Sequence, residues 1–170
     1  MAHLIALSGL PGVGKSTIAA EVARARRACY LRVDTVERAL GESVLAIAKA
    51  QNAGYRAIMA VAADNLRLGL DVVADTVNPL ALTRGWWHKT ARAVRAECLD
   101  VEIICSDPAE HRRRVEARRA RDPGAGYPDW AAVEARQYDR WEGDRLVLDS
   151  ARFSAEDCAK LILSALSDDF

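Results

Sequence analysis

The segment GLPGVGKST, which runs from Gly9 to Thr17, decides the fold of this chain. It fits the phosphate-binding loop pattern G-x-x-x-x-G-K-[ST] at every fixed position. The residues before it, Leu4 to Leu7, form a short apolar run that is typical of a buried parallel strand. The residues after it, Ile18 to Arg24, contain no glycine or proline and favour a helix. The sequence therefore predicts a strand, a glycine-rich loop and a helix in succession.

This succession suits the binding of phosphate groups. Glycine lets the backbone approach an anion closely, and the N–H groups of a helix N-terminus point toward it. In this pattern the lysine reaches the β- and γ-phosphates, and the hydroxyl of Ser16 ligates Mg²⁺. The sequence contains no N-K-x-D stretch, which is the motif that indicates guanine specificity. We therefore predict ATP and Mg²⁺ as cofactors. The expected contacts are Gly9, Gly12, Val13, Gly14, Lys15, Ser16 and Thr17, with Arg114 from a later helix.

Composition favours one globular domain over residues 1–170. About half of the residues are hydrophobic, with 51% in that class, and the formal net charge is zero. A dedicated nucleic-acid binder usually carries a basic excess, so nucleic acid is the less favoured partner. No apolar stretch is long enough to span a bilayer, and the chain enters its first strand without a signal peptide. We therefore expect a cytoplasmic protein without membrane contact, as a monomer or homodimer.

The cysteines and histidines show no metal-binding spacing. No two cysteines form a C-x-x-C pair, which indicates free thiols in a reducing compartment. The histidines are scattered in the same way. The residues are Cys29, Cys98, Cys105 and Cys158, with His3, His88 and His111.

Strands alternate with helices along the whole chain, which predicts an α/β fold with a parallel sheet covered on both faces. The expected strands are residues 4–7, 29–33, 70–75, 101–105 and 146–149. The expected helices are residues 18–24, 35–40, two between 43 and 69 with a break at 52–54, then 85–98, 109–120, 129–138 and 154–167.

Ligands of such sheets bind beyond the carboxyl ends of the strands. Asp34 follows the second strand, and its carboxylate can accept the proton of a hydroxyl that attacks the γ-phosphate. Arg38 lies one helical turn later and is expected to hold the acceptor. The alternative for Asp34 is an N-cap of the next segment.

Asp75 ends the third strand and resembles a Walker B acid, which holds the magnesium shell. No second acid follows, because Thr76 and Val77 stand where an ATPase that activates water often has glutamate. Asp75 and Asn78 are expected to bind the acceptor instead. The alternative is a turn at the end of the strand.

Residues 111–121 contain six arginines and precede a loop with two glycines. Such a run is usually a solvated helix face. It also suits a mobile lid, at about residues 112–128, that brings an arginine to the transferring phosphoryl group. Arg118 is the first candidate, followed by Arg114, which shares its helix face, and Arg121.

Taken together, these residues resemble the small P-loop kinases of the AAA type. The likeness is to chloramphenicol phosphotransferase-like, adenylylsulfate kinase-like and gluconate kinase-like enzymes, and to polynucleotide 5′-hydroxyl kinases. It implies a three-layer P-loop NTPase fold of about five parallel strands with a small lid. It also implies that Asp34 is the general base, that Arg114 and Arg118 form the lid pair, and that residues 146–149 lie by the adenine. The short, glycine-rich loop at residues 122–126 departs from the pattern and leaves open which arginine serves the lid.

The resemblance implies ATP-dependent phosphorylation of a hydroxyl group. The leading hypothesis is a kinase for a small molecule such as an antibiotic, a sugar or a nucleoside. Its catalytic residues would be Lys15, Asp34 and Arg118, and its acceptor would contact Asp34, Arg38, Asp75 and Asn78. One alternative is a polynucleotide 5′-hydroxyl kinase, which requires a basic channel. The other is a regulatory switch that binds ATP and hydrolyses it slowly.

Overall fold

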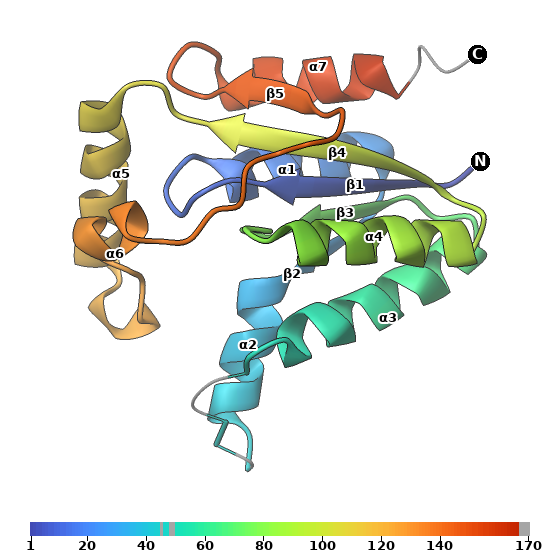
Figure 1. The fold of residues 1–170 in the computed structure, drawn as a ribbon, viewed down its shortest axis with the longest axis horizontal. Helices are drawn as coiled ribbons and strands as arrows, with labels where there is room; N and C mark the ends of the chain where they lie inside the picture. The colour runs from blue at the N-terminus through green and yellow to red at the C-terminus, as the bar shows by residue number, and fades with distance from the viewer. Residues whose placement is uncertain (45, 48–49, 167–170) are drawn as a thin grey trace.

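A parallel sheet of five strands forms the centre of the computed structural model, which describes residues 1–44, 46–47 and 50–166 (Figure 1). The strand order is β2-β3-β1-β4-β5, and each neighbouring pair is parallel. The predicted α/β fold is therefore confirmed. The strands are β1 (His3–Ser8), β2 (Cys29–Arg32), β3 (Val72–Asp75), β4 (Glu97–Ile104) and β5 (Leu146–Asp149).

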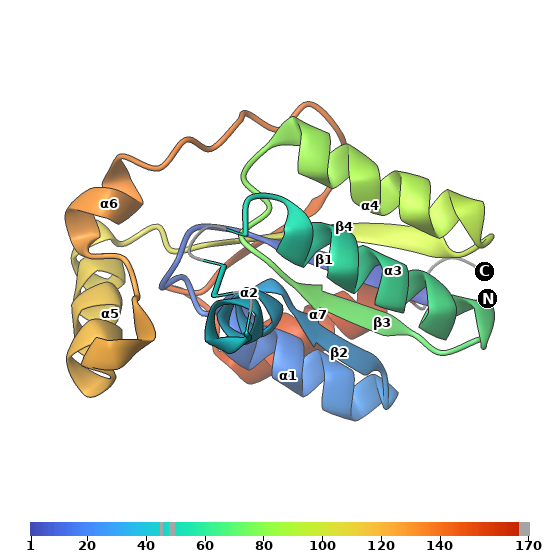
Figure 2. The same cartoon turned by 90° about the horizontal axis from the view of Figure 1, so that it is seen from below.

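Alternate residues of β1 enter two separate hydrophobic cores because successive strand residues face opposite sides of a sheet. Ile5 and Leu7 pack in the core that α1 and α7 cover, whereas Leu4 and Ala6 pack in the core under α3 and α4. Figure 2 shows these helix pairs on opposite sides of the sheet. The helices are α1 (Lys15–Arg26), α3 (Ala53–Arg67), α4 (Ala81–Ala93) and α7 (Ala155–Ala165).

The remaining helical segments gather beyond the carboxyl ends of the strands. In Figure 1 the arrowheads of β1, β4 and β5 point toward α5 and α6. The carboxylate of Asp107 starts α5 by accepting hydrogen bonds from the backbone N–H groups of Ala109 and Glu110. This arrangement places α5, η1 and α6, together called the lid segment, over the edge of the sheet at which ligands of such folds bind. The segments are α2 (Val33–Glu42), α5 (Pro108–Arg121), the 3-10 turn η1 (Pro123–Ala125) and α6 (Trp130–Glu134).

The helices are short, from five residues in α6 to 15 in α3. In the part of the chain that the structure describes, none is long and apolar enough to cross a membrane.

The segment after β2 differs from the sequence-based expectation. Helix α2 begins at Val33 and continues through Gly41 to Glu42, so the expected helix over residues 35–40 is too short. The first of the two helices expected after Ser43 is not formed by the described residues there, because Ala46 and Gln51 have φ angles of 44° and 49°. Residues 45, 48 and 49 lie outside the described residues. The second expected helix is α3.

The predictions around α4 and α6 are also wrong at their ends. Helix α4 starts at Ala81 rather than at residue 85. The carboxylate of Asp139, which is distant in the sequence, accepts a hydrogen bond from the Ala81 N–H at 3.0 Å. It ends at Ala93 rather than residue 98, because β4 already pairs with β1 at Glu97. Helix α6 ends at Glu134, four residues before the expected end.

Candidate functional site

The loop after β1 has a backbone that only glycine adopts easily. Gly9, Gly12 and Gly14 have φ angles of 138°, 89° and 98°. A Cβ atom at Gly9 would collide with the carbonyl oxygen of Ile103, and one at Gly12 would lie 2.5 Å from a methyl carbon of Val115. The loop is therefore packed tightly against β4 and α5 on one side, which fixes where its N–H groups point.

The N-terminus of α1 provides a site for an anion. Its N-cap, Gly14, has no side chain to accept a hydrogen bond, and the first turn holds no acidic residue. The first N–H groups of a helix lack intrahelical partners, and the helix dipole favours negative charge there. Ser16 is partly exposed and Thr17 is exposed in this turn, whereas Val13 is buried in the core. The loop therefore fits a polyphosphate, and Ser16 is the residue that would hold Mg²⁺.

Lys15 carries a positive charge into this buried loop. Its side chain is only 7% exposed, and its ammonium donates a hydrogen bond to the carbonyl oxygen of Leu10 at 2.8 Å. Burial lowers the pKa of Lys15 to about 8, although the carboxylates of Asp75 and Asp34 oppose that shift. Among the described residues no carboxylate forms an ion pair with this ammonium, so a bound phosphate would supply a negative partner in close contact.

Asp75 is held firmly at the end of β3. It is 5% exposed and accepts hydrogen bonds from the hydroxyl of Tyr30 at 2.9 Å and from Nε of Arg32 at 3.1 Å. Burial and the neighbouring carboxylate together raise the pKa of Tyr30, so its hydroxyl stays a donor. Asp75 lines the same cleft as Lys15, close to where the magnesium shell would lie.

Asn78 lies behind the wall of this cleft. It is fully buried, and its side-chain amide donates a hydrogen bond to the hydroxyl of Ser8 at 3.0 Å. Its backbone N–H donates to the hydroxyl of Tyr55 at 2.9 Å. Its neighbours Val77 and Pro79 line the cleft, whereas Asn78 does not. The structure therefore places Asn78 outside the lining of the cleft, where Tyr55 and Ser8 accept its hydrogen bonds and its Oδ1 has no hydrogen-bond partner among the described residues.

The cleft has a volume of about 740 Å³ and lies between the loop, α2 and the lid segment. Asp34 lines it from the first turn of α2, where its side chain is 54% exposed and does not cap the helix. Arg118 of α5 reaches across, so that its guanidinium lies 3.8 Å from the Asp34 carboxylate. The expected base and the expected lid arginine thus meet in one cleft, which also contains Lys15, Ser16, Arg38 and Asp75.

Arg118 is oriented by the lid loop. Its guanidinium stacks over the ring of Tyr127 at 3.6 Å from the centroid. Arg114, on the same helix, instead donates hydrogen bonds to Glu110 at 2.7 Å and to the Ser150 hydroxyl at 2.9 Å. Ser150 lies beside Gly14 and follows β5, so Arg114 is near the loop but outside the cleft. Arg121 is exposed and also lies outside the cleft.

The sequence analysis missed several residues that line the cleft. Glu37 is the one that a sequence pattern could have identified, because it follows Asp34 by three residues on a helix and therefore shares its face. Burial and the neighbouring Asp34 raise the pKa of Glu37. Only the fold brings three other residues to the cleft, which are Tyr55 of α3, Tyr127 of the loop before α6 and Arg136 after α6.

The burial of Lys15 yields a prediction about stability. We expect Lys15→Met to raise the free energy of unfolding of the nucleotide-free protein at pH 7 by roughly 1–3 kcal/mol, because it removes a poorly paired buried charge. The folded-state pKa of about 8 is below the usual 10.5, so the folded chain binds fewer protons than the unfolded chain between these values. The advantage of the variant should therefore shrink as the pH rises from 8 to 10.5.

Urea denaturation at pH 7 and pH 10 measures both effects. Lys89→Met is the matched control, because Lys89 is exposed on α4 and its replacement should change stability by less than about 0.5 kcal/mol. A Lys15→Met protein that is less stable than the unmodified protein at pH 7 would contradict the interpretation.

Solved structures with the same fold include two complexes with nucleotide analogues and a gluconokinase. The APS kinase CysC of Mycobacterium tuberculosis, in complex with AMPPNP and APS, is 20% identical, covers 98% of each chain and has a TM-score of 0.72. Kti12 of Chaetomium thermophilum, in complex with ADP-AlF3, is 18% identical over 97% of each chain, with a TM-score of 0.73. A gluconokinase from Sinorhizobium meliloti is 15% identical, covers 98% of this chain and 94% of its own, and has a TM-score of 0.68.

These similarities confirm, at the level of fold, the resemblance to small P-loop kinases. No curated protein matches the sequence. The family model described as AAA domain matches residues 4–144, which include the glycine loop, β2, β3, β4 and the lid segment. The chain therefore belongs to the AAA domain family.

Proposed function

We propose that this protein is an ATP-dependent phosphotransferase that moves the γ-phosphate to a hydroxyl group of a small molecule. One observation carries the proposal: the guanidinium of Arg118 lies 3.8 Å from the carboxylate of Asp34, in the cleft that Lys15 and Ser16 also line. A base, two cations and a magnesium-binding hydroxyl are the groups that phosphoryl transfer needs. Their convergence in one cleft supports this function better than simple nucleotide binding.

The proposed roles follow from charge and position. The acceptor oxygen forms a bond to the γ-phosphorus while the bond from that phosphorus to the β–γ bridging oxygen breaks. Asp34 takes the proton that leaves the acceptor hydroxyl. Lys15 and Arg118 balance the negative charge that develops on the phosphoryl oxygens. Mg²⁺, held through Ser16, would neutralise the β- and γ-phosphate oxygens when bound.

The cleft supports a small acceptor. Its volume of about 740 Å³ lies in the range of small-molecule sites. Tyr55 and Tyr127 offer ring surfaces, while Arg38 and Arg136 offer charged donors. The fold is shared with an APS kinase and a gluconokinase, which supports phosphotransfer in general terms. Antibiotics, sugars and nucleosides carry hydroxyls of a suitable size.

The alternatives have weaker support. A polynucleotide kinase needs a basic channel, but Arg112 and Arg113 of the exposed lid face pair with Glu116 and Glu110 on the same helix. Efficient hydrolysis by an ATPase switch needs a group after Asp75 that orients water. The hydroxyl of Thr76 at that position is buried and donates to the carbonyl oxygen of Leu7 at 3.0 Å.

A transfer assay tests the proposal. Purified protein, ATP and Mg²⁺ are incubated with antibiotics, sugars, nucleosides and 5′-hydroxyl oligonucleotides, and the products are identified by mass. We expect one small-molecule acceptor to gain one phosphoryl group. Asp34→Asn should lower kcat by about 10²–10⁴-fold with little change in ATP affinity, because general-base catalysis is worth that factor. Transfer to the oligonucleotide alone, or an unchanged kcat in Asp34→Asn, would contradict the assignment.

The lid arginine gives a second prediction. Arg118→Ala should lower kcat by about 10³-fold or more, since an arginine that balances transition-state charge is typically worth that much. Arg119→Ala is the matched control, because Arg119 is exposed and pairs weakly with Asp129 at 3.9 Å. It should leave kcat within about twofold. Equal losses in the two variants would show that total lid charge, rather than Arg118, matters.

A further inference from the structure

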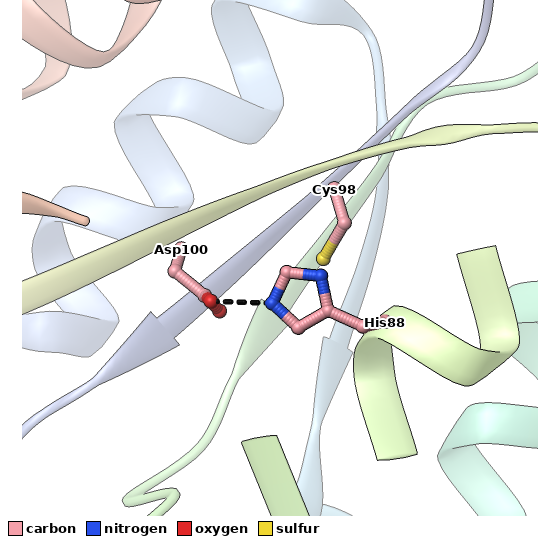
Figure 3. Close-up of side chains that lie close together, drawn as sticks. All are labelled: His88, Cys98 and Asp100. Carbon is pink, nitrogen blue, oxygen red and sulfur yellow. Dashed lines mark hydrogen bonds and ion pairs between the residues drawn. The ribbon is translucent and has the colours of Figure 1, made fainter. Parts of the chain in front are cut away.

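His88, Cys98 and Asp100 form a second cluster of reactive side chains, which lies outside the cleft. Cys98 and Asp100 are two residues apart on β4 and therefore face the same side of the sheet. His88 reaches them from α4, which covers that side. In Figure 3 the ring of His88 lies between the other two, with one ring nitrogen facing Asp100 and the other close to the Cys98 sulfur. One ligand atom from each residue lies within 4.8 Å of the others.

Asp100 is the unusual member of the cluster. Its side chain is 5% exposed, and Oδ2 is 2.6 Å from Nε2 of His88. Its other oxygen, Oδ1, is buried and has no hydrogen-bond partner among the described residues. A buried carboxylate oxygen without a partner is costly. A divalent cation would supply the missing charge and a ligand bond to this oxygen.

No charged side chain among the described residues supplies a hydrogen bond to Oδ1 of Asp100. Burial raises the pKa of Asp100, and the hydrogen bond from His88 only partly opposes the rise. Arg84 is the nearby cation of α4, but its guanidinium donates to the backbone oxygens of Asn78, Pro79 and Asp139. Burial and the charge of Asp100 raise the pKa of the Cys98 thiol to about 12, and the charge of Arg92 opposes this rise.

The three ligand types select the class of metal. A thiolate, an imidazole and a carboxylate together suit Zn²⁺, whereas Mg²⁺ and Ca²⁺ prefer oxygen ligands only. Ligands at about 2.0–2.3 Å from one ion lie about 3–4 Å apart. The longest separation in the cluster therefore needs to contract by about 1 Å, and the 2.6 Å contact between His88 and Asp100 needs to lengthen if both of its atoms bind the ion. The side chain of His88 is 40% exposed, which gives an ion and a water ligand access.

We propose that His88, Cys98 and Asp100 form a binding site for Zn²⁺ or a similar divalent metal ion. The bound ion would link α4 to β4, away from the nucleotide cleft. Water completes the coordination. Metal binding displaces the thiol proton of Cys98, so one proton leaves for each ion bound when His88 is neutral. This inference is independent of the proposed phosphotransfer, because it concerns different residues and the nucleotide-free protein.

Co²⁺ is the spectroscopic probe for this site. The full chain, reduced and free of nucleotide, is titrated with Co²⁺ and then with Zn²⁺ at pH 7.5. We expect one ion per chain, a sulfur-to-cobalt charge-transfer band that Zn²⁺ abolishes, and release of about one proton by calorimetry in two buffers. Zn²⁺ should also raise Tm, because it binds the folded chain preferentially.

Variants distinguish the cluster from other thiols and histidines. Cys98→Ser should remove the cobalt–sulfur band, and His88→Gln or Asp100→Asn should weaken binding by at least about 100-fold. Cys105→Ser and His3→Gln are the matched controls and should behave like the unmodified protein. A band that persists in Cys98→Ser would overturn the proposal. An unmodified protein that shows no cobalt–sulfur band would overturn it without any variant.

Discussion

The buried ammonium of Lys15 is the constraint on which the site depends. The glycine loop bends around it, and its hydrogen bond within the described residues is to a single carbonyl oxygen. Burial at this position opposes the charged state, as the lowered pKa of Lys15 shows. The chain tolerates that cost because the core between the sheet, α1 and α7 holds the loop from behind, with Val13 buried in it and Leu10 packed against it. A loop of this kind is preorganised for a polyphosphate before the ligand arrives.

The rest of the fold brings other charges to the same edge. The parallel order β2-β3-β1-β4-β5 places Asp75 next to the loop, and α2 presents Asp34 one strand further along. The lid segment returns over this edge and brings Arg118, oriented by Tyr127, to Asp34. Asp75 from the sheet, Asp34 from α2 and a cation from the lid segment therefore line one cleft of about 740 Å³. In the proposed phosphotransfer, this division would let lid closure complete the site around a substrate.

Local signals predicted the fold and part of the site. The glycine pattern, the apolar strands and the acids after them are short-range features, and they located Lys15, Asp34 and Asp75 at the cleft. Long-range contacts could not be predicted: Asp139 starts α4 from 58 residues away, and Ser8 and Tyr55 enclose Asn78. The same limit hid the cluster of His88, Cys98 and Asp100, whose spacing of ten and two residues matches no metal motif. The pairing of β4 with β1 from Glu97 onward sets where Cys98 and Asp100 lie.

The most direct test of the account compares the binding of ATP·Mg²⁺ and AMP by calorimetry, in the unmodified protein and in Lys15→Met. If the loop and its buried ammonium are built for the β- and γ-phosphates, ATP should bind far more tightly than AMP. Lys15→Met should weaken ATP binding by about 10–100-fold, as expected for loss of a charge-assisted contact of roughly 1.5–3 kcal/mol, and leave AMP binding unchanged. Equal affinities for ATP and AMP, or an unchanged ATP affinity in the variant, would contradict the central claim.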